Sequence, residues 1–412
     1  MAWLESIQRR FFGGFWNPYA SLVAAGVGAA LYFGFTGTLW AVTGEFTRWG
    51  GNLLQLFGVD PTGWAYFKAI KLTSSPLTRS DGWLVIGMLL GSLVSALMSG
   101  HFKIRWPAHA RRWVQGLVGG LLAGFGTRLA MGCNLAAFFT GLPQFSLHTW
   151  LFILGTGLGS YLGVKVAVRP FMAGQPRLEH GVRTVALAEA SAKAGPHRHL
   201  WAGLVAGGAT LTLTAAAIAA GHPIWGLAGL FGAAFGILIQ RGQVCFTAGL
   251  RNLWLFGDGT LAKAILLGMA VQSIGTAIFI YKGVPPIIHW ASLGALLGGV
   301  MFGVGIVVAG GCETGWMYRL MEGQMQFLSV AVGNVVGATV LAYGWDHWGI
   351  YQALVAPWPE VNLIHTWGWL GGLVATFAFL AALWAVVAWR ERTFRIQRQA
   401  RAPIPWRQSA AR

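Results

Sequence analysis

The 412-residue sequence has few charged residues, which make up only 10% of the chain, whereas 55% of its residues are hydrophobic. Acidic residues are especially scarce: 12 stand against 29 lysines and arginines, a net charge of +17. A water-soluble fold this apolar has too few polar side chains to cover its surface, whereas a bilayer accepts an apolar surface. The composition therefore excludes an ordinary soluble domain and indicates a membrane protein.

Long apolar runs are abundant, and about 20 such residues cross a hydrocarbon core roughly 30 Å thick. Because a spanning segment must satisfy its own backbone groups, these runs predict helices. We expect an all-α, polytopic fold of about ten transmembrane helices, some of them re-entrant or broken. The predicted spans cover 19–42, 83–99, 115–142, 147–168, 200–220, 223–240, 262–281, 290–310, 326–343 and 367–389.

Basic residues are concentrated in alternate loops. With both termini in the cytoplasm, 23 lysines and arginines lie on the cytoplasmic side and 5 on the other side. This asymmetry follows the positive-inside rule, so topology accounts for the positive charge without nucleic acid. The expected surroundings are the lipid bilayer, and both termini are predicted to be cytoplasmic.

Cysteine is scarce too, and Cys133, Cys245 and Cys312 are the only three. All lie near predicted membrane depth, which argues against a disulfide framework of the secreted kind. Three interpretations of the thiols stay open: inert small hydrophobes, ligands of a soft metal, or weak S–H donors to a soft, sulfur-bearing anion. No CxxC motif and no neighbouring histidine accompany them. The sequence therefore favours neither a metal nor a cofactor.

Two stretches of the chain read alike. AGFGTRLAMGCN ends at Asn134, and FGVGIVVAGGCE ends at Glu313. Upstream of each lies a weaker pair, AVTGEFTRW from Ala41 and CFTAGLRNLW from Cys245. The repeat is displaced by five predicted spans, an odd number, so the two halves should enter the membrane in opposite directions.

The repeat divides the chain into four parts. Residues 1–164 form the first membrane repeat, 165–222 a basic cytoplasmic linker with a connecting span, and 223–343 the second, inverted repeat. Residues 344–412 hold an external loop, the final span and an arginine-rich cytoplasmic tail. Inverted repeats are typical of transporters, with the site at the interface of the two halves. A duplicated helical bundle with a packing role only is the alternative.

The repeated motifs place a glycine, a cysteine and a polar residue together at membrane depth. Most glycines in spans serve close helix packing. Gly132-Cys133-Asn134 and Gly311-Cys312-Glu313 instead favour broken helices whose free N–H groups face a cavity. Because the two motifs are related by the repeat, we expect Cys133 and Cys312 to face each other across one midplane site.

Arg128 is the one lysine or arginine that lies well inside a predicted span rather than near its end. An arginine at membrane depth is a candidate functional residue. Its alternative roles are a structural pair with Glu45 or Glu313, or extension of the side chain toward an interface. Glu313 itself could pair with Arg319 or take part in proton coupling, and Glu45 could form a local ion pair with Arg48.

Longer motifs carry a resemblance to a known family. GTLWAVTGEFTRWGG from Gly37, LAMGCNLAAFFTG from Leu129, PQFSLH from Pro143 and AGGCETGWMYR from Ala309 are similar to the YeeE/YedE family of bacterial sulfur-transport membrane proteins, and closest to its YedE branch. The resemblance covers essentially the whole chain except residues 170–198 and the tail.

The resemblance implies a transporter of the bacterial inner membrane, rather than an enzyme, that takes up a small thiosulfate-like anion through a central constriction. Cys133, Cys245 and Cys312 match the positions that pass the anion along by S–H···S hydrogen bonds. One relay thiol is missing, because Ala41 or Val42 stands at the first-half counterpart of Cys245.

The YedE branch is associated with selenium metabolism, which makes a selenium-containing anion a second candidate substrate. The resemblance also implies a TusA-like sulfur-carrier protein as a cytoplasmic partner. The alternative functions are a membrane-embedded sulfur or selenium transferase, and an anchor for such a carrier.

Overall fold

The computed structural model describes residues 10–73, 75–169 and 196–401, together with the single positions 6, 8 and 172. Most of the predicted linker 165–199 and the end of the tail beyond residue 401 lie outside the described residues. Ten helices in the described ranges are long and apolar enough to cross a membrane. The prediction of an all-α, multi-pass membrane protein with ten spans is therefore confirmed.

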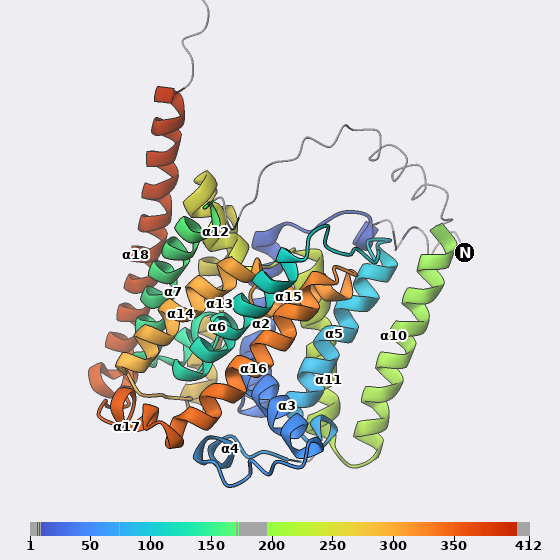
Figure 1. Cartoon of the computed structure of the whole chain (residues 1–412), viewed down its shortest axis with the longest axis horizontal. Helices are drawn as coiled ribbons and strands as arrows, with labels where there is room; N and C mark the ends of the chain where they lie inside the picture. Colours follow the sequence, from blue (N-terminus) through green and yellow to red (C-terminus); the bar gives the residue numbers. More distant parts are fainter. Residues whose placement is uncertain are drawn as a thin grey trace, which may run out of the picture.

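The ten long helices follow one another along the chain with shorter helices between them, as the colours of Figure 1 show. The long ones are α2 (Pro18–Thr36), α5 (Ser80–Met98), α6 (Arg111–Leu129), α7 (His148–Ala167), α10 (Pro196–Ala219), α11 (Pro223–Arg241), α13 (Thr260–Tyr281), α14 (Leu293–Ala309), α16 (Gln326–His347) and α18 (Leu363–Arg401). The short ones are α3 (Thr43–Leu56), α4 (Ala65–Ala69), η1 (Pro76–Thr78), the π-helix η2 (Asn134–Phe139), η3 (Leu142–Gln144), α12 (Phe246–Phe256), α15 (Glu313–Met321) and α17 (Ile350–Leu354).

The long helices pack in pairs around a common centre. Helix α2 packs on α13 and α5 packs on α11, while α6 packs on α16 and α7 packs on α14. Helices α6 and α14 also pack against each other. Helix α10 lies at one side against α5 and α11, and α18 lies at the other side against α12 and α13 (Figure 1). The two outer spans, α10 and α18, are the least buried of the ten.

Glycines bring these helix pairs into backbone contact. A Cβ atom on Gly91 of α5 would lie 2.1 Å from the carbonyl oxygen of Ala233 in α11. One on Gly124 of α6 would lie 2.1 Å from the carbonyl oxygen of Asn334 in α16. Close approach of this kind is the usual role of small residues between membrane helices. The predicted packing role of most span glycines is thus confirmed at these crossings.

Two long helices are interrupted at the repeated motifs. Helix α6 ends at Leu129 and η2 begins at Asn134, while α14 ends at Ala309 and α15 begins at Glu313. In each gap one residue adopts the left-handed conformation: Met131 with φ 59° and Gly310 with φ 78°. These two residues hold matching positions in the repeated motifs. Non-helical backbone at membrane depth must be buried in protein or line a cavity. Cys133 and Cys312 are buried, and Met131 and Gly310 are half-buried. The predicted broken helices are confirmed.

The close helix contacts generate a stability prediction. Gly124→Val should lower the apparent melting temperature, because its side chain would meet backbone of α16 and overpacking costs about 1–3 kcal/mol. Gly157→Val, on α7, is the matched control, since a Cβ there meets nothing within 4 Å. Thermal unfolding of the detergent-purified protein measures both. Equal melting temperatures for the two variants would contradict the packing described for α6 and α16.

Candidate functional site

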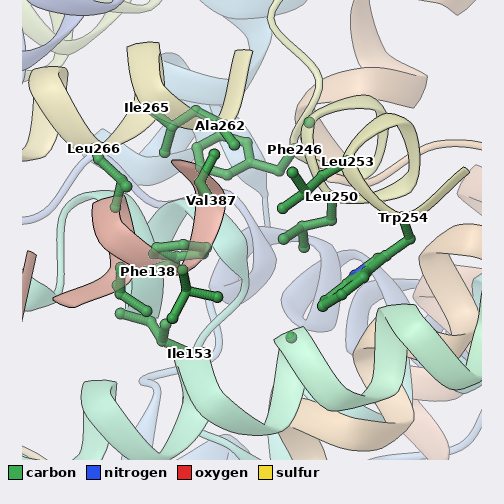
Figure 2. A pocket seen from close by; sticks show the side chains of 14 residues that line it. Phe138, Ile153, Phe246, Leu250, Leu253, Trp254, Ala262, Ile265, Leu266 and Val387 are labelled. Carbon is green, nitrogen blue, oxygen red and sulfur yellow. The ribbon is translucent and has the colours of Figure 1, made fainter. Parts of the chain in front are cut away.

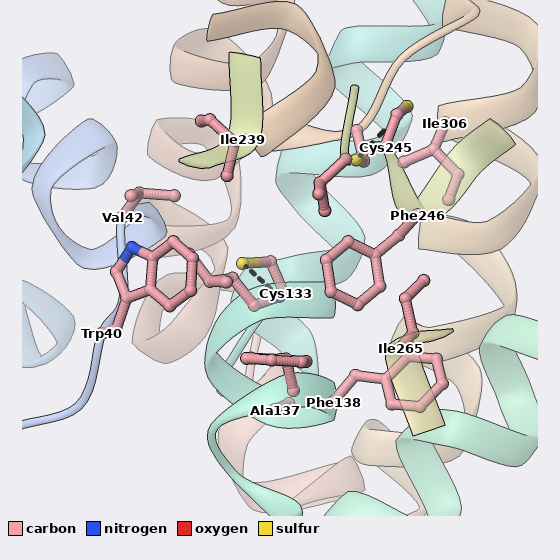
Figure 3. Close-up of a cluster of buried hydrophobic side chains, with 14 of the residues drawn as sticks. Trp40, Val42, Cys133, Ala137, Phe138, Ile239, Cys245, Phe246, Ile265 and Ile306 are labelled. Atoms are coloured by element: carbon pink, nitrogen blue, oxygen red, sulfur yellow. Dashed lines mark hydrogen bonds between the residues drawn. The ribbon is translucent and has the colours of Figure 1, made fainter. Parts of the chain in front are cut away.

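Each cysteine stands immediately before the start of a short helix in the buried centre of the molecule. Cys133 is the N-cap of η2, Cys245 the N-cap of α12 and Cys312 the N-cap of α15. All three side chains are 0–1% exposed. Val42 is the N-cap of α3, so an aliphatic side chain stands there in place of the thiol that Cys245 presents before α12. Figure 3 shows Cys133 and Cys245 in one cluster with Trp40 and Phe246.

Two of the thiols are in direct contact. The Sγ atoms of Cys245 and Cys312 lie 3.9 Å apart, and the Cys312 thiol lies 3.2 Å from the hydroxyl of Thr314. The Cys133 sulfur instead accepts a hydrogen bond from the backbone N–H of Leu135 at 3.3 Å. The sequence predicted that Cys133 faces Cys312, and it did not predict the contact between Cys245 and Cys312. This contact forms because α12 brings Cys245, which has no matching cysteine in the first half, to the start of α15.

A glycine makes room for the thiol pair. A Cβ atom on Gly315 would lie 2.6 Å from the Cys245 sulfur and 3.5 Å from the Cys312 sulfur. Gly132 and Gly311 have another role: a Cβ atom on either would lie 2.8 Å from the side chain of Ala137 or of Phe327, respectively. They permit tight packing at the two helix breaks, whereas Gly315 borders the sulfur atoms themselves.

Buried polar atoms without hydrogen-bond partners surround the cysteines. Both amide atoms of Asn134, which follows Cys133, have no partner within the described part of the chain. The same holds for Oε2 of Glu313, which follows Cys312, and for the hydroxyl of Thr247, two residues after Cys245. Because buried polar groups nearly always find a partner, these atoms mark a place where a polar ligand or water is expected.

Glu313 does not pair with Arg319. Its Oε1 atom accepts a hydrogen bond from the amide of Asn334 at 3.0 Å, on α16. Arg319 donates to the carbonyl oxygen of Gly310 at 2.8 Å and to the Tyr318 hydroxyl at 3.1 Å. The predicted Glu313–Arg319 pair is wrong, because the turns of α15 direct the two side chains to different neighbours.

Arg128 is buried and is held by hydroxyl groups. It donates hydrogen bonds to Thr43 and, at 3.3 Å, to the hydroxyl of Tyr66. Among the described residues it forms no ion pair, so the suggested pairs with Glu45 and Glu313 are wrong. Burial, and then the positive charge of Arg128, lower the pKa of His289 in the loop 282–292 to about 4. The imidazole ring of His289 is therefore neutral near pH 7.

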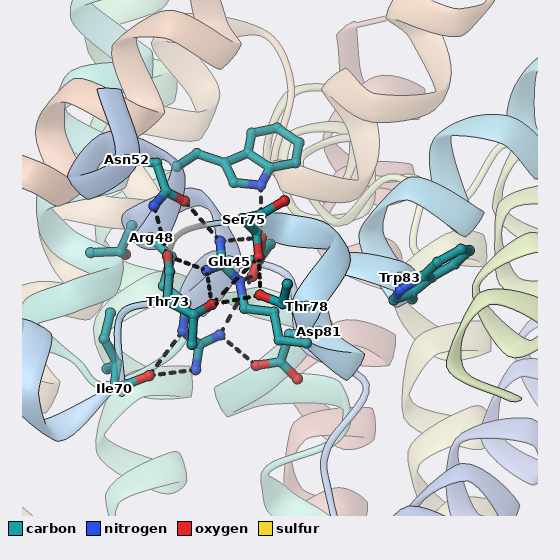
Figure 4. Close-up of polar contacts among 12 residues, drawn as sticks. Glu45, Arg48, Asn52, Ile70, Thr73, Ser75, Thr78, Asp81 and Trp83 are labelled. Atoms are coloured by element: carbon teal, nitrogen blue, oxygen red, sulfur yellow. Dashed lines mark hydrogen bonds and ion pairs between the residues drawn. The ribbon is translucent and has the colours of Figure 1, made fainter. Parts of the chain in front are cut away.

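Glu45 belongs to a separate polar cluster on the side of α3 and α4 (Figure 4). We call it the Glu45 cluster; its charged members are Glu45, Arg48, Arg79 and Asp81. Arg79 donates to both carboxylate oxygens of Glu45, at 2.7 and 2.8 Å. The predicted Glu45–Arg48 ion pair is present at 3.5 Å, while Arg48 approaches Asp81 more closely, at 2.6 Å. Both arginines in this cluster are thus neutralised by carboxylates.

An apolar pocket of about 100 Å³ adjoins the thiol region (Figure 2). Its walls come from η2, α7, α12, α13 and α18, and include Phe138, Phe246 and Trp254. Such a lining offers an anion no compensating charge or hydrogen bond. The pocket therefore separates the cysteines from the outer span α18 and is not itself a candidate anion site. No group of three or more potential metal-ligating side chains comes together within the described ranges.

Some of these residues left a signal in the sequence and others did not. Thr43 and Thr247 are matched by the repeat, and each now lies in the polar centre. Tyr66 comes from the segment between α3 and α5, which has no counterpart in the second half, so nothing marked it as a partner of Arg128. Gly315 belongs to the AGGCETGWMYR motif, but nothing in the sequence placed it beside Cys245.

Comparisons with known proteins agree on one family. The chain matches the model of the sulphur transport family over residues 2–162 and 241–412. It is 46% identical to the probable transporter YedE of Escherichia coli K12 over 401 residues, which cover 96% of this chain and 97% of the relative. It is 42% identical to the thiosulfate transporter TsuA of Spirochaeta thermophila over 104 residues, which cover 24% of this chain and 31% of that protein.

Two of the buried arginines, Arg79 and Arg128, generate opposite stability predictions. Arg79→Met should lower the apparent melting temperature strongly, since losing one partner of a buried ion pair costs about 3–5 kcal/mol. Arg128→Met should not lower it, because removal of an unpaired charge offsets the lost hydrogen bonds to Thr43 and Tyr66. Thermal unfolding of the two purified variants measures the difference. A fall for Arg128→Met as large as that for Arg79→Met would assign Arg128 a structural role.

Proposed function

The chain belongs to the sulphur transport family, and from this we propose that it carries a small sulfur-containing anion across the membrane through the centre occupied by Cys133, Cys245 and Cys312. The observation that supports this proposal best is the position of the cysteines: three buried thiols, each at the first turn of a helix, two of them in contact. The finer points, a constriction lined by thiols and a relay between them, are part of the same proposal.

Helix starts and thiols suit a soft anion for different reasons. The N-termini of α12 and α15 present free backbone N–H groups and the positive end of the helix dipole, which favour negative charge. The Cys245 and Cys312 thiols are weak donors with a polarisable sulfur, which suits a ligand that has sulfur as its terminal atom. A thiosulfate-like anion combines both properties, since it has a negative oxyanion end and a soft sulfur end.

The polar surroundings support the same centre. Asn134, Thr247 and Glu313 each keep a buried polar atom unpaired within the described part of the chain, next to the three cysteines. Arg128 adds a positive charge that no carboxylate among the described residues neutralises. These groups would replace part of the hydration shell that an anion loses on leaving water.

We also propose that the two halves form an inverted repeat with this centre at their interface. If α2, α5, α6 and α7 correspond to α11, α13, α14 and α16, the packing of α2 on α13 corresponds to that of α5 on α11. In the same way, α6 on α16 corresponds to α7 on α14. The left-handed residues Met131 and Gly310 agree with this correspondence. Repeats of this kind place the substrate near the membrane midplane.

The proposed orientation in the membrane follows from the distribution of charge, and inward transport is part of the proposal. We place both termini, with the loops 99–110 and 322–325, at the cytoplasmic face of a bacterial inner membrane, because most basic residues lie on that side. We call this the basic face. Uptake then runs from the face that carries α4 and α17 toward the basic face. The primary substrate in this proposal is a thiosulfate-like anion, and a selenium-containing analogue is a candidate competitor for the same site.

Removal of a thiol should reduce transport. In proteoliposomes, uptake of ³⁵S-labelled thiosulfate is expected to fall about tenfold or more for Cys245→Ala and for Cys312→Ala, because a hydrogen bond to a charged group contributes about 1.5–3 kcal/mol. Cys133→Ala tests the third thiol in the same assay. Unlabelled selenite and thiosulfate, added as competitors to the wild-type protein, distinguish the two substrate classes.

The matched control is Thr210→Ala, which removes a buried hydroxyl from the outer helix α10. Its uptake per folded protein should equal that of the wild type. Wild-type uptake in all three cysteine variants would contradict any role of the thiols, although the family's transport function would stand.

A second variant tests the space beside the thiols without removing them. Gly315→Ala places a methyl group 2.6 Å from the Cys245 sulfur, so the thiol pair must separate or the helix start must shift. We expect thiosulfate uptake, measured per folded protein, to fall severalfold. Gly249→Ala on α12 is the control, because its Cβ would meet its neighbours at ordinary distances of 3.4–3.6 Å. Equal uptake in both variants would show that the geometry around the thiol pair does not limit transport.

A further inference from the structure

A polar cavity of about 480 Å³ opens near the basic face, between α6, α12, α15 and α16. Three arginines contribute to its lining, Arg112 from α6, Arg251 from α12 and Arg319 from α15. Four glutamines complete most of the polar wall: Gln115, Gln243, Gln324 and Gln326. Arg112 is exposed at the surface, whereas Arg251 and Arg319 are half-buried deeper inside. Of the described residues, no aspartate or glutamate lines the cavity.

The three guanidinium groups are bound only to neutral partners in the described part of the chain. Arg112 donates to the side chain of Gln115 at 3.2 Å, and Arg251 to that of Asn252 at 3.3 Å. Arg319 donates to the Gly310 carbonyl and the Tyr318 hydroxyl. The Nε atom of Arg251 is buried and has no partner among the described residues. Arginines of the Glu45 cluster, in contrast, contact carboxylates directly.

One carboxylate lies behind the cavity wall. Glu322 is buried and accepts hydrogen bonds from the amide groups of Gln240, Gln243 and Gln324, at 2.9, 2.9 and 3.2 Å. The amide nitrogens of all three glutamines are directed at Glu322; Gln243 and Gln324 also line the cavity, whereas Glu322 does not. Three positive charges therefore face the cavity and one negative charge is covered by glutamines, which leaves the cavity suited to an anion.

The inner end of the cavity reaches the backbone that carries the thiol pair. Gly310 and Gln243 line it, and both adopt the left-handed conformation, with φ 78° and 49°. Gly310 precedes Cys312 by two residues, and Gln243 precedes Cys245 by two residues. An anion in the cavity would thus lie one turn of backbone from the two sulfur atoms in contact.

We propose that this cavity is a second anion site, which holds a small divalent oxyanion between Arg251 and Arg319, with Arg112 at its mouth. Guanidinium groups present paired donors that match the oxygen atoms of such an anion. The cavity has room for a small oxyanion together with water molecules, so the anion would remain partly hydrated. Its place on the transport path rests on the proposed function, whereas the binding itself does not.

Sulfate is the probe that separates this site from the thiols, because it has the oxyanion charge but no terminal sulfur atom. Isothermal titration of the full-length protein with sulfate, in nanodiscs of zwitterionic phosphatidylcholine, should show saturable binding. Arg251→Gln and Arg112→Gln should each weaken it about tenfold, the expected loss for one charge-assisted hydrogen bond. Arg392→Gln removes the same charge from an exposed position on α18 and should leave sulfate affinity unchanged.

The Cys312→Ala variant distinguishes oxyanion binding in the cavity from thiosulfate transport past the thiols. It should bind sulfate as the wild type does, even if transport of thiosulfate is lost. Nanodiscs that contain anionic phosphatidylglycerol test a lipid headgroup as the occupant. Sulfate affinity unaffected by Arg251→Gln, no saturable binding, or abolition of sulfate binding by phosphatidylglycerol would each overturn the assignment of a free oxyanion site.

Discussion

The structure depends on one constraint: backbone that leaves the helical conformation inside a membrane must be enclosed by protein. Helices α12 and α15 and the π-helix η2 begin in the buried centre, each at a cysteine. Glycines at the crossings of α5 with α11 and α6 with α16 bring the surrounding helices close enough to enclose these starts. Because the enclosure is tight, the free N–H groups and the thiols meet a small volume rather than lipid.

Charge is distributed unequally around this enclosed centre. In the Glu45 cluster, Arg48 and Arg79 are held by carboxylates, which makes that cluster a structural element. Arg128 in the centre and the arginines of the cavity near the basic face have no such partners among the described residues. Under the proposed function, these positive charges would favour an anion that moves from the centre toward that face.

Much of the fold followed from local features of the sequence. Apolar run length located the ten spans, and the Gly-Cys motifs located the helix breaks, since both signals lie within one segment. The contacts that build the site were harder to predict, because they join distant segments. Cys245 meets Cys312 only through the way α12 approaches α15. Arg128 is held by Tyr66, from a segment without a counterpart in the other half, and Glu45 is held by Arg79, 34 residues away.

The central claim is that the anion passes the thiols at the starts of the helices. Its most direct measurement is a crystal structure of the protein soaked with selenosulfate, with diffraction data collected at the selenium absorption edge. Selenium takes the place of the terminal sulfur, so its anomalous signal locates the soft end of the anion. The account predicts a peak in contact with the sulfur of Cys133, Cys245 or Cys312. A well-occupied selenium peak elsewhere, with none beside these three residues, would contradict it.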